Sequence, residues 1–133
     1  MSKTDVTLAE SAIHNPNEPR HFMVVDPAKK TVTVRFGDTV LAKSRQALRL
    51  KEVGYKVYDP VLYLPSSAVL APLTPSKKHT NCPLKGDCEW YSLEMDDGGD
   101  IAWSYPTPFD FARAIAGRIA FDASRVVVEE APL

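Results

Sequence analysis

The sequence has little excess charge, no long apolar run and only two cysteines. Its 133 residues carry 16 basic and 17 acidic side chains, a net charge of −1. The sequence therefore has no excess of charge that would favour nucleic acid or an anionic membrane surface as a partner. The longest apolar runs, such as Val61–Leu64, are far too short to span a bilayer. We therefore predict a protein that binds neither nucleic acid nor membrane.

The cysteines and the first residues indicate the compartment. Residues 1–6 have none of the apolar character of a secretory signal peptide. Without export, Cys82 and Cys88 are expected to remain thiols rather than to form a disulfide. The expected location is the cytoplasm.

Eleven prolines and the spacing of apolar residues predict a mainly β fold. Residues 31–36 alternate apolar and polar, and Gly37-Asp38 is a two-residue link that suits a type II′ hairpin into residues 39–42. Residues 44–53 fit a helix or a strand, and the composition that follows favours a strand. The other predicted strands are 21–25, 61–65, 88–95, 100–105, 119–121 and 125–129.

Two loops and one helix complete the predicted fold. Residues 66–76 are expected to form a loop, and residues 96–99 to link strands 88–95 and 100–105 into a second hairpin. A short helix is predicted near residues 108–116, with Thr107 as N-cap, Pro108 at the first helical position and Gly117 after its end.

We thus expect a polar lead-in over residues 1–20 and a single β-rich domain over residues 21–133. The domain would be an antiparallel sheet folded over on itself, like a small barrel or a tent.

Three sequence blocks resemble the signatures of one family. Residues 80–86 are similar to T-x-C-P-x-K-G, residues 102–108 to A-W-x-Y-x-x-P, and residues 115–121 to I-x-G-x-x-A-F. Over about residues 20–129 the chain resembles the small bacterial and fungal domains called domain of unknown function 427. The resemblance implies a folded-over antiparallel sheet with a short helix, and it implies no assigned activity. The nucleotidyltransferase label sometimes used for the family has no chemical basis in this sequence. Metal-dependent nucleotidyl transfer needs clustered carboxylates to hold Mg²⁺, and the sequence contains no Gly-Ser followed by paired aspartates.

The most informative stretch is residues 78–91, in which a thiol, an imidazole and an ammonium group fall close together. Cys82 would be a reactive thiolate if Lys85 or His79 lowered its pKa, and otherwise a small buried hydrophobe that braces the loop. Lys85 beside Gly86 would bind an anion such as carboxylate or phosphate, or would simply be a solvated turn residue.

The same stretch offers potential metal ligands. His79, Cys82 and Cys88 are three of the four that a structural zinc site needs, and the spacing of His14 and His21 does not identify a fourth. We therefore predict neither a metal nor a cofactor.

Two functions are consistent with these residues. In the first, the domain binds a small, anionic ligand in a pocket lined by the His79–Gly86 loop, and Cys82 or Lys85 reacts if the protein is an enzyme. The ligand-binding candidates are Glu52, which could instead pair with Lys85, and Tyr63, His79, Thr80, Trp103 and Tyr105. In the alternative, the protein is a non-catalytic interaction or assembly domain that forms a homo-oligomer or a complex with a partner, and it uses the loop only to brace its sheet.

Overall fold

The computed structural model describes residues 7–96 and 98–133, and its architecture is mainly β, as predicted. The first six residues of the expected lead-in, and Asp97 in the expected 96–99 link, lie outside the described residues. The strands are β1 Ile13–Asn15, β2 Glu18–Pro27, β3 Lys30–Phe36, β4 Thr39–Ser44, β5 Leu48–Val53, β6 Val61–Tyr63, β7 Leu73–Cys82, β8 Gly86–Leu93, β9 Asp100–Ser104, β10 Ile119–Phe121 and β11 Val127–Pro132. Two 3₁₀ helices, η1 Ser66–Ala68 and η2 Asp110–Ile115, accompany them.

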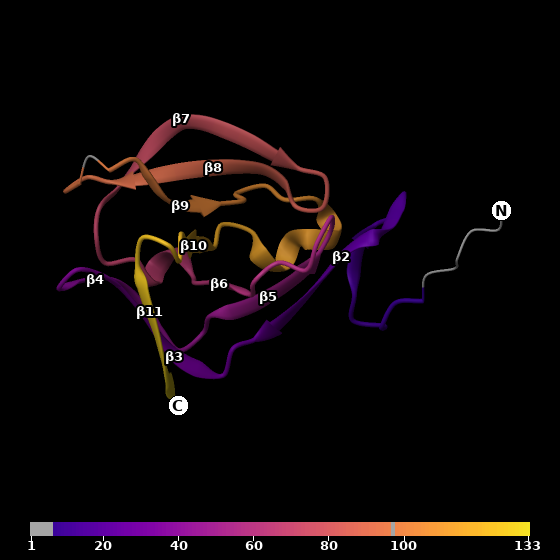
Figure 1. Ribbon diagram of the computed structural model, residues 1–133, viewed down its shortest axis with the longest axis horizontal. Helices are drawn as coiled ribbons and strands as arrows, with labels where there is room; N and C mark the ends of the chain where they lie inside the picture. Colours follow the sequence, from indigo (N-terminus) through magenta and orange to yellow (C-terminus); the bar gives the residue numbers. More distant parts are fainter. Residues whose placement is uncertain (1–6, 97) are drawn as a thin grey trace.

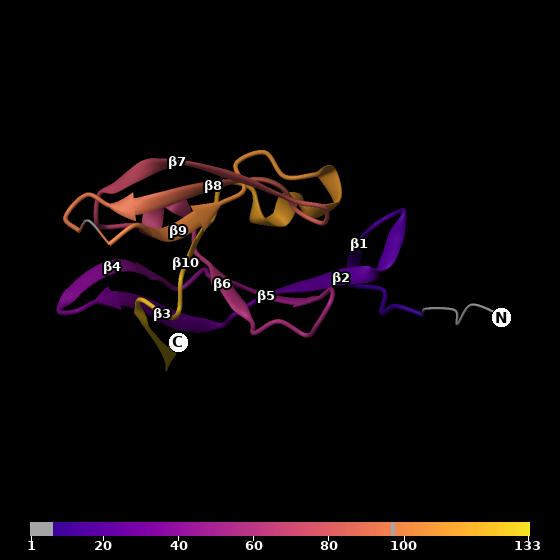
Figure 2. The same ribbon diagram turned by 45° about the horizontal axis from the view of Figure 1, so that its top comes forward.

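The strands form three antiparallel sheets, with the orders β1-β2-β5-β6, β10-β9-β8-β7 and β11-β3-β4. Strands β7, β8 and β9 form one layer, and β2, β3, β4 and β5 lie in a second layer facing it (Figures 1 and 2). None of the sheets, as far as residues 7–96 and 98–133 show, closes into a barrel. The expectation of a mainly β, antiparallel architecture is confirmed, and the strands are divided among three sheets where one folded-over sheet was expected.

Both predicted hairpins are present. Strands β3 and β4 are joined by Gly37 and Asp38, with Phe36 paired to Thr39 and Gly37 at φ +58°. The segment that fitted either a helix or a strand contains β5, so the strand interpretation is correct. Strands β8 and β9 form the second hairpin.

The predicted loop at 66–76 is correct for residues 66–72 and wrong from Leu73 onward, and the predicted loop at His79–Gly86 is largely strand. Strand β7 begins at Leu73, and it pairs with β8 from Leu73 opposite Leu93 to Cys82 opposite Gly86. A shift of register between Pro75 and His79 accommodates the proline that had suggested a loop. Only residues 83–85, between the paired ends of the two strands, form the turn.

The predicted helix exists, but it is a 3₁₀ helix over Asp110–Ile115. Its N-cap is Phe109, which makes no side-chain capping hydrogen bond, so the assignment of Thr107 as N-cap is wrong. The Phe109 amide instead donates to the Lys85 carbonyl at 3.0 Å, so tertiary pairing fixes where the helix begins. Gly117, at φ +68°, follows the helix end as expected.

Two clusters of buried side chains lie between the sheets. The first joins β3 and β4 to β9 and β10, and it includes Val32, Val34, Leu41, Ile101 and Phe121. The second joins β2, β5 and β6 to β8, β9 and η2, and it includes Met23, Leu50, Tyr63, Cys88, Tyr105 and Ile115. Across residues 7–96 and 98–133, no helix has the length and apolar character needed to cross a membrane.

Gly86 and Gly37 provide a matched test of the hairpin turns. Gly86 has φ +114°, and a Cβ built there would lie 3.3 Å from the Pro108 Cα. Gly37 has φ +58°, and a Cβ there would meet no heavy atom of the described residues within 4 Å. We expect Gly37→Ala to reduce the free energy of unfolding by about 1 kcal/mol and Gly86→Ala by about 2–3 kcal/mol. Urea unfolding measures both, and equal losses would contradict the close packing assigned to Gly86.

Candidate functional site

Strands β2 and β5 place an imidazole and a carboxylate on one face of their sheet. Met23 lies directly opposite Glu52 in the register, so His21, two residues before Met23, is the diagonal neighbour of Glu52. The His21 Nε2 atom lies 2.7 Å from Glu52 Oε2. Because Met23 and Leu50 on the same face are buried in the second core cluster, this face is directed towards the interior.

The tip of the β7–β8 hairpin brings a lysine to the same carboxylate. The Lys85 amide donates to the Cys82 carbonyl at 3.2 Å, and the Asn15 side-chain amide donates to the Pro83 carbonyl at 3.2 Å. The first bond closes the turn, and the bonds from Asn15 and from the Phe109 amide attach it to two other segments of the chain. The Lys85 ammonium then donates to Glu52 Oε1 and lies 5.6 Å from the centre of the Tyr105 ring.

The Lys85–Glu52 ion pair is nearly enclosed. The two side chains are only 9% and 13% exposed, so each charge has lost most of its hydration. Burial of the carboxyl opposes ionisation, but hydrogen bonds from His21 and Lys85 outweigh it and hold the pKa of Glu52 below its ordinary value of 4.5. Glu52 is therefore ionised at neutral pH, and it connects Lys85 on one side with His21 on the other.

An open cavity of about 600 Å³ lies over this group, and we call it the Glu52 cavity. Its size is within the range of small-molecule sites. Its lining consists of Asn15, Asn17, Glu18, Arg20, His21, Glu52, Gly54, Tyr55, Tyr58, Asn81, Cys82 and Pro83. Seven of these twelve residues are Asn, Glu, Arg or His, and two tyrosines from the segment after β5 add aromatic surface.

The residues predicted from the stretch 78–91 are separated by the fold. Cys82 lines the Glu52 cavity, whereas Lys85 lies behind Glu52 and is not part of the lining. His79 and Thr80 are exposed on β7 and do not line the cavity. Thr80 Oγ1 accepts a hydrogen bond from Trp90 Nε1 at 2.9 Å.

The other predicted residues lie mainly in the core. Tyr63 and Tyr105 are 1% and 7% exposed, and burial raises the pKa of both hydroxyls well above the ordinary value. Trp103 packs against Trp90 on the neighbouring strand, with ring centres 5.4 Å apart, and donates from Nε1 to the Tyr63 hydroxyl at 3.1 Å. These contacts account for the three aromatic residues as packing and hydrogen-bonding groups of the sheet.

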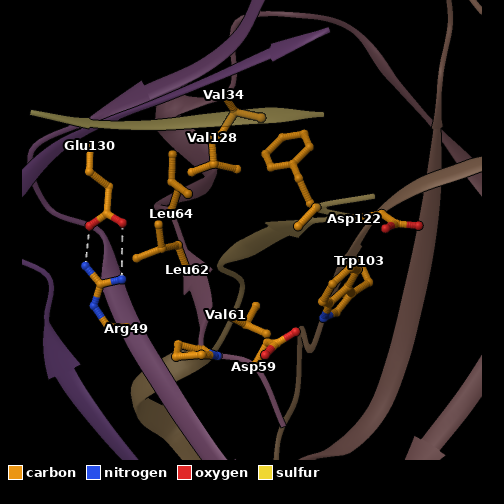
Figure 3. Close-up of a pocket in the computed structure, with 13 residues that line it drawn as sticks. Val34, Arg49, Asp59, Val61, Leu62, Leu64, Trp103, Asp122, Val128 and Glu130 are labelled. Atoms are coloured by element: carbon orange, nitrogen blue, oxygen red, sulfur yellow. Dashed lines mark hydrogen bonds and ion pairs between the residues drawn. The ribbon is translucent and has the colours of Figure 1, made fainter. Parts of the chain in front are cut away.

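Trp103 also lines a second cavity of about 270 Å³, which we call the Trp103 cavity (Figure 3). Its walls are mostly apolar and include Val34, Leu62, Leu64, Phe121 and Val128. Arg49 from β5 and Glu130 from β11 form a two-pronged ion pair at its edge (Figure 3). Because this pair satisfies both charges, the cavity offers fewer uncommitted polar groups than the Glu52 cavity.

His21 is the main residue that sequence reasoning missed. It was considered only as a spare zinc ligand, alongside His79, Cys82 and Cys88. The structure instead groups His21, Glu52 and Cys82, whose potential ligand atoms lie within 4.8 Å of one another. A carboxylate, an imidazole and a thiol at this separation can orient a polar ligand, activate the thiol as a nucleophile or hold a metal ion.

Comparison with family models identifies a family for this chain. The family described as "Domain of unknown function (DUF427)" matches residues 24–131, which is most of the chain. A search of curated proteins found no match.

The buried ion pair has a pH-dependent effect on stability. Glu52→Gln leaves the Lys85 ammonium without its counter-charge, and we expect it to reduce the free energy of unfolding by about 3 kcal/mol at pH 7. Because the pKa of Glu52 is lowered in the folded state, its contribution is complete above pH 4.5 and is lost as the pH falls through the folded value. The difference between the wild type and Glu52→Gln should therefore shrink in acid.

Chemical denaturation at several pH values measures this difference. Glu130→Gln is the matched control, because it breaks the more exposed pair with Arg49 and should cost about 1 kcal/mol or less. A loss for Glu52→Gln as small as that of the control would contradict the importance of the Lys85–Glu52 pair.

The two cysteines should differ in reactivity. Cys82 is half-buried and lines the cavity, whereas Cys88 is 1% exposed and burial raises the pKa of its thiol. In reduced protein treated with a chelator, we expect iodoacetamide to alkylate Cys82 while the chain is native and Cys88 only after unfolding. Peptide mass spectrometry at successive times identifies the modified residue, and alkylation of both at one rate would contradict the placement of Cys82.

Proposed function

The chain belongs to the DUF427 family, and from this starting point we propose that it binds a small polar ligand in the Glu52 cavity. The observation that carries the proposal is the meeting of three strands at one open cavity, where His21, Glu52 and Cys82 lie together. Buried polar groups of this kind are costly to the fold unless they are compensated. Their concentration below an accessible space is typical of binding and catalytic sites.

The cavity wall indicates what such a ligand would contain. Arg20 and Asn17 offer hydrogen-bond donors to a carboxylate or phosphate. The amides of Asn15 and Asn81 already donate to the Pro83 carbonyl and the Asp87 carboxylate, and each keeps a second N–H for a ligand. Lys85 does not contribute directly, because its ammonium is held by Glu52. The anionic ligand expected from the sequence would therefore be bound through Arg20 and the amides.

The tyrosines suggest an additional planar or apolar part of the ligand. Tyr55 is fully exposed and Tyr58 is 36% exposed, and both line the cavity. An exposed aromatic ring beside polar donors provides a stacking surface that costs the fold nothing to present. We propose a ligand with a flat body and one anionic group.

A reducing compartment is part of the proposal. Both cysteines are thiols, and a thiol in an open cavity stays reduced more readily in the cytoplasm than outside the cell.

Native mass spectrometry of the purified protein, repeated after denaturation, tests the proposal first. A bound mass that disappears on denaturation would identify the ligand. A bare polypeptide that assembles into a stable oligomer would favour the alternative of an interaction domain.

Tyr55→Ala and Val57→Ala then locate the binding site. Both side chains are highly exposed, but only Tyr55 lines the cavity. We expect neither variant to change the melting temperature appreciably, because neither removes buried contacts. Tyr55→Ala should weaken ligand binding about three- to tenfold through loss of stacking, and Val57→Ala should leave it unchanged. Titration calorimetry measures the affinities, and equal effects in the two variants would place the ligand elsewhere.

A further inference from the structure

His21, Glu52 and Cys82 each direct a metal-binding atom to one place, and all three atoms lie within 4.8 Å of one another. They come from β2, β5 and the end of β7, so the tertiary fold brings them together. We propose that these three side chains bind a divalent transition metal ion, with Zn²⁺ as the preferred ion.

The distances are compatible with a tetrahedral site after small side-chain movements. Zinc bonds of about 2.0–2.3 Å to nitrogen, oxygen and sulfur place neighbouring ligand atoms about 3.3–3.7 Å apart. His21 Nε2 and Glu52 Oε2, now 2.7 Å apart, would separate slightly to admit the ion. The Cys82 sulfur, within 4.8 Å of both, would move inward by about 1 Å at most. All three side chains border the open cavity, which gives the ion a path in.

Lys85 has a defined role in this site. It donates to Glu52 Oε1, which leaves Oε2 directed at His21 and at the position of the ion. A hydrogen bond to the outer oxygen fixes the orientation of a ligating carboxylate. The positive charge of Lys85 opposes a dication, and the thiolate offsets this effect. Because a metal ion binds the thiolate and the neutral imidazole, Cys82 releases its thiol proton to solvent when the ion binds, and His21 binds as the neutral imidazole.

The ligand set determines which ion is selected. One sulfur, one nitrogen and one oxygen suit Zn²⁺ or Co²⁺ far better than Mg²⁺ or Ca²⁺, which prefer oxygen alone. Three protein ligands leave one coordination position, as in catalytic zinc sites. That position would face the Glu52 cavity, and this last point rests on the proposed ligand-binding function. Metal binding itself does not depend on it.

Cobalt titration of the reduced, metal-free 133-residue protein tests the site. We expect a single equivalent of Co²⁺ to produce a thiolate-to-cobalt charge-transfer band in the near ultraviolet and the intense visible bands of tetrahedral cobalt. Zn²⁺ should remove both. Cys82→Ser and His21→Ala should abolish the charge-transfer band or weaken Co²⁺ binding at least tenfold.

Matched controls come from the same residue types elsewhere in the chain. His79→Ala removes an exposed imidazole on β7, and Cys88→Ala removes the thiol that does not line the cavity. Both controls should retain the wild-type spectrum. Absence of the charge-transfer band in the wild type, or its persistence in Cys82→Ser, would overturn the proposal.

A second measurement avoids variants altogether. In the wild type, stoichiometric Zn²⁺ should slow alkylation of Cys82 by iodoacetamide at least tenfold, and Mg²⁺ should not. Equal protection by the two ions, or none by Zn²⁺, would overturn the site even if a variant failed to fold. Tyr55→Ala separates this result from the ligand-binding proposal, because it should lose ligand affinity and keep the cobalt spectrum.

Discussion

The buried contact between Lys85 and Glu52 is the interaction on which the rest of the site depends. It joins the tip of the β7–β8 hairpin to the end of β5, and thus one layer of the fold to the other. An ion pair taken out of water is stabilising only when its geometry is well supported. Here the backbone bonds of the turn and the hydrogen bond from His21 provide that support. Together with the hydrogen bond from His21, the pair keeps Glu52 ionised in spite of its burial.

Local sequence patterns were sufficient for much of the fold. The alternation in residues 31–36 and the Gly37-Asp38 link identify a hairpin, because both the period and the turn are encoded within a few residues. Strand β7 was not predicted because Pro72 and Pro75 are typical of a loop. The strand is formed by pairing with β8, which is not evident from the local sequence. The start of η2 was misplaced for the same kind of reason, since its first amide is bound by a residue of the distant hairpin turn.

The site was less predictable than the fold. Cys82, Lys85 and Glu52 were identified as candidates, and the pairing of Glu52 with Lys85 was one of the alternatives considered. His21 reaches Glu52 only through the register of β2 against β5, which no local pattern specifies. His79 was selected because it is close to Cys82 in sequence, but it is exposed on β7 and does not line the cavity.

The T-x-C-P-x-K-G stretch at residues 80–86 combines residues with separate structural and chemical roles. Lys85 and Gly86 hold the hairpin against β5 and the segment before η2, whereas Cys82 borders the open cavity. A substitution of Cys82 can therefore leave the roles of Lys85 and Gly86 unchanged. A relative that keeps the lysine and glycine but replaces the cysteine would retain the architecture and lose the thiol.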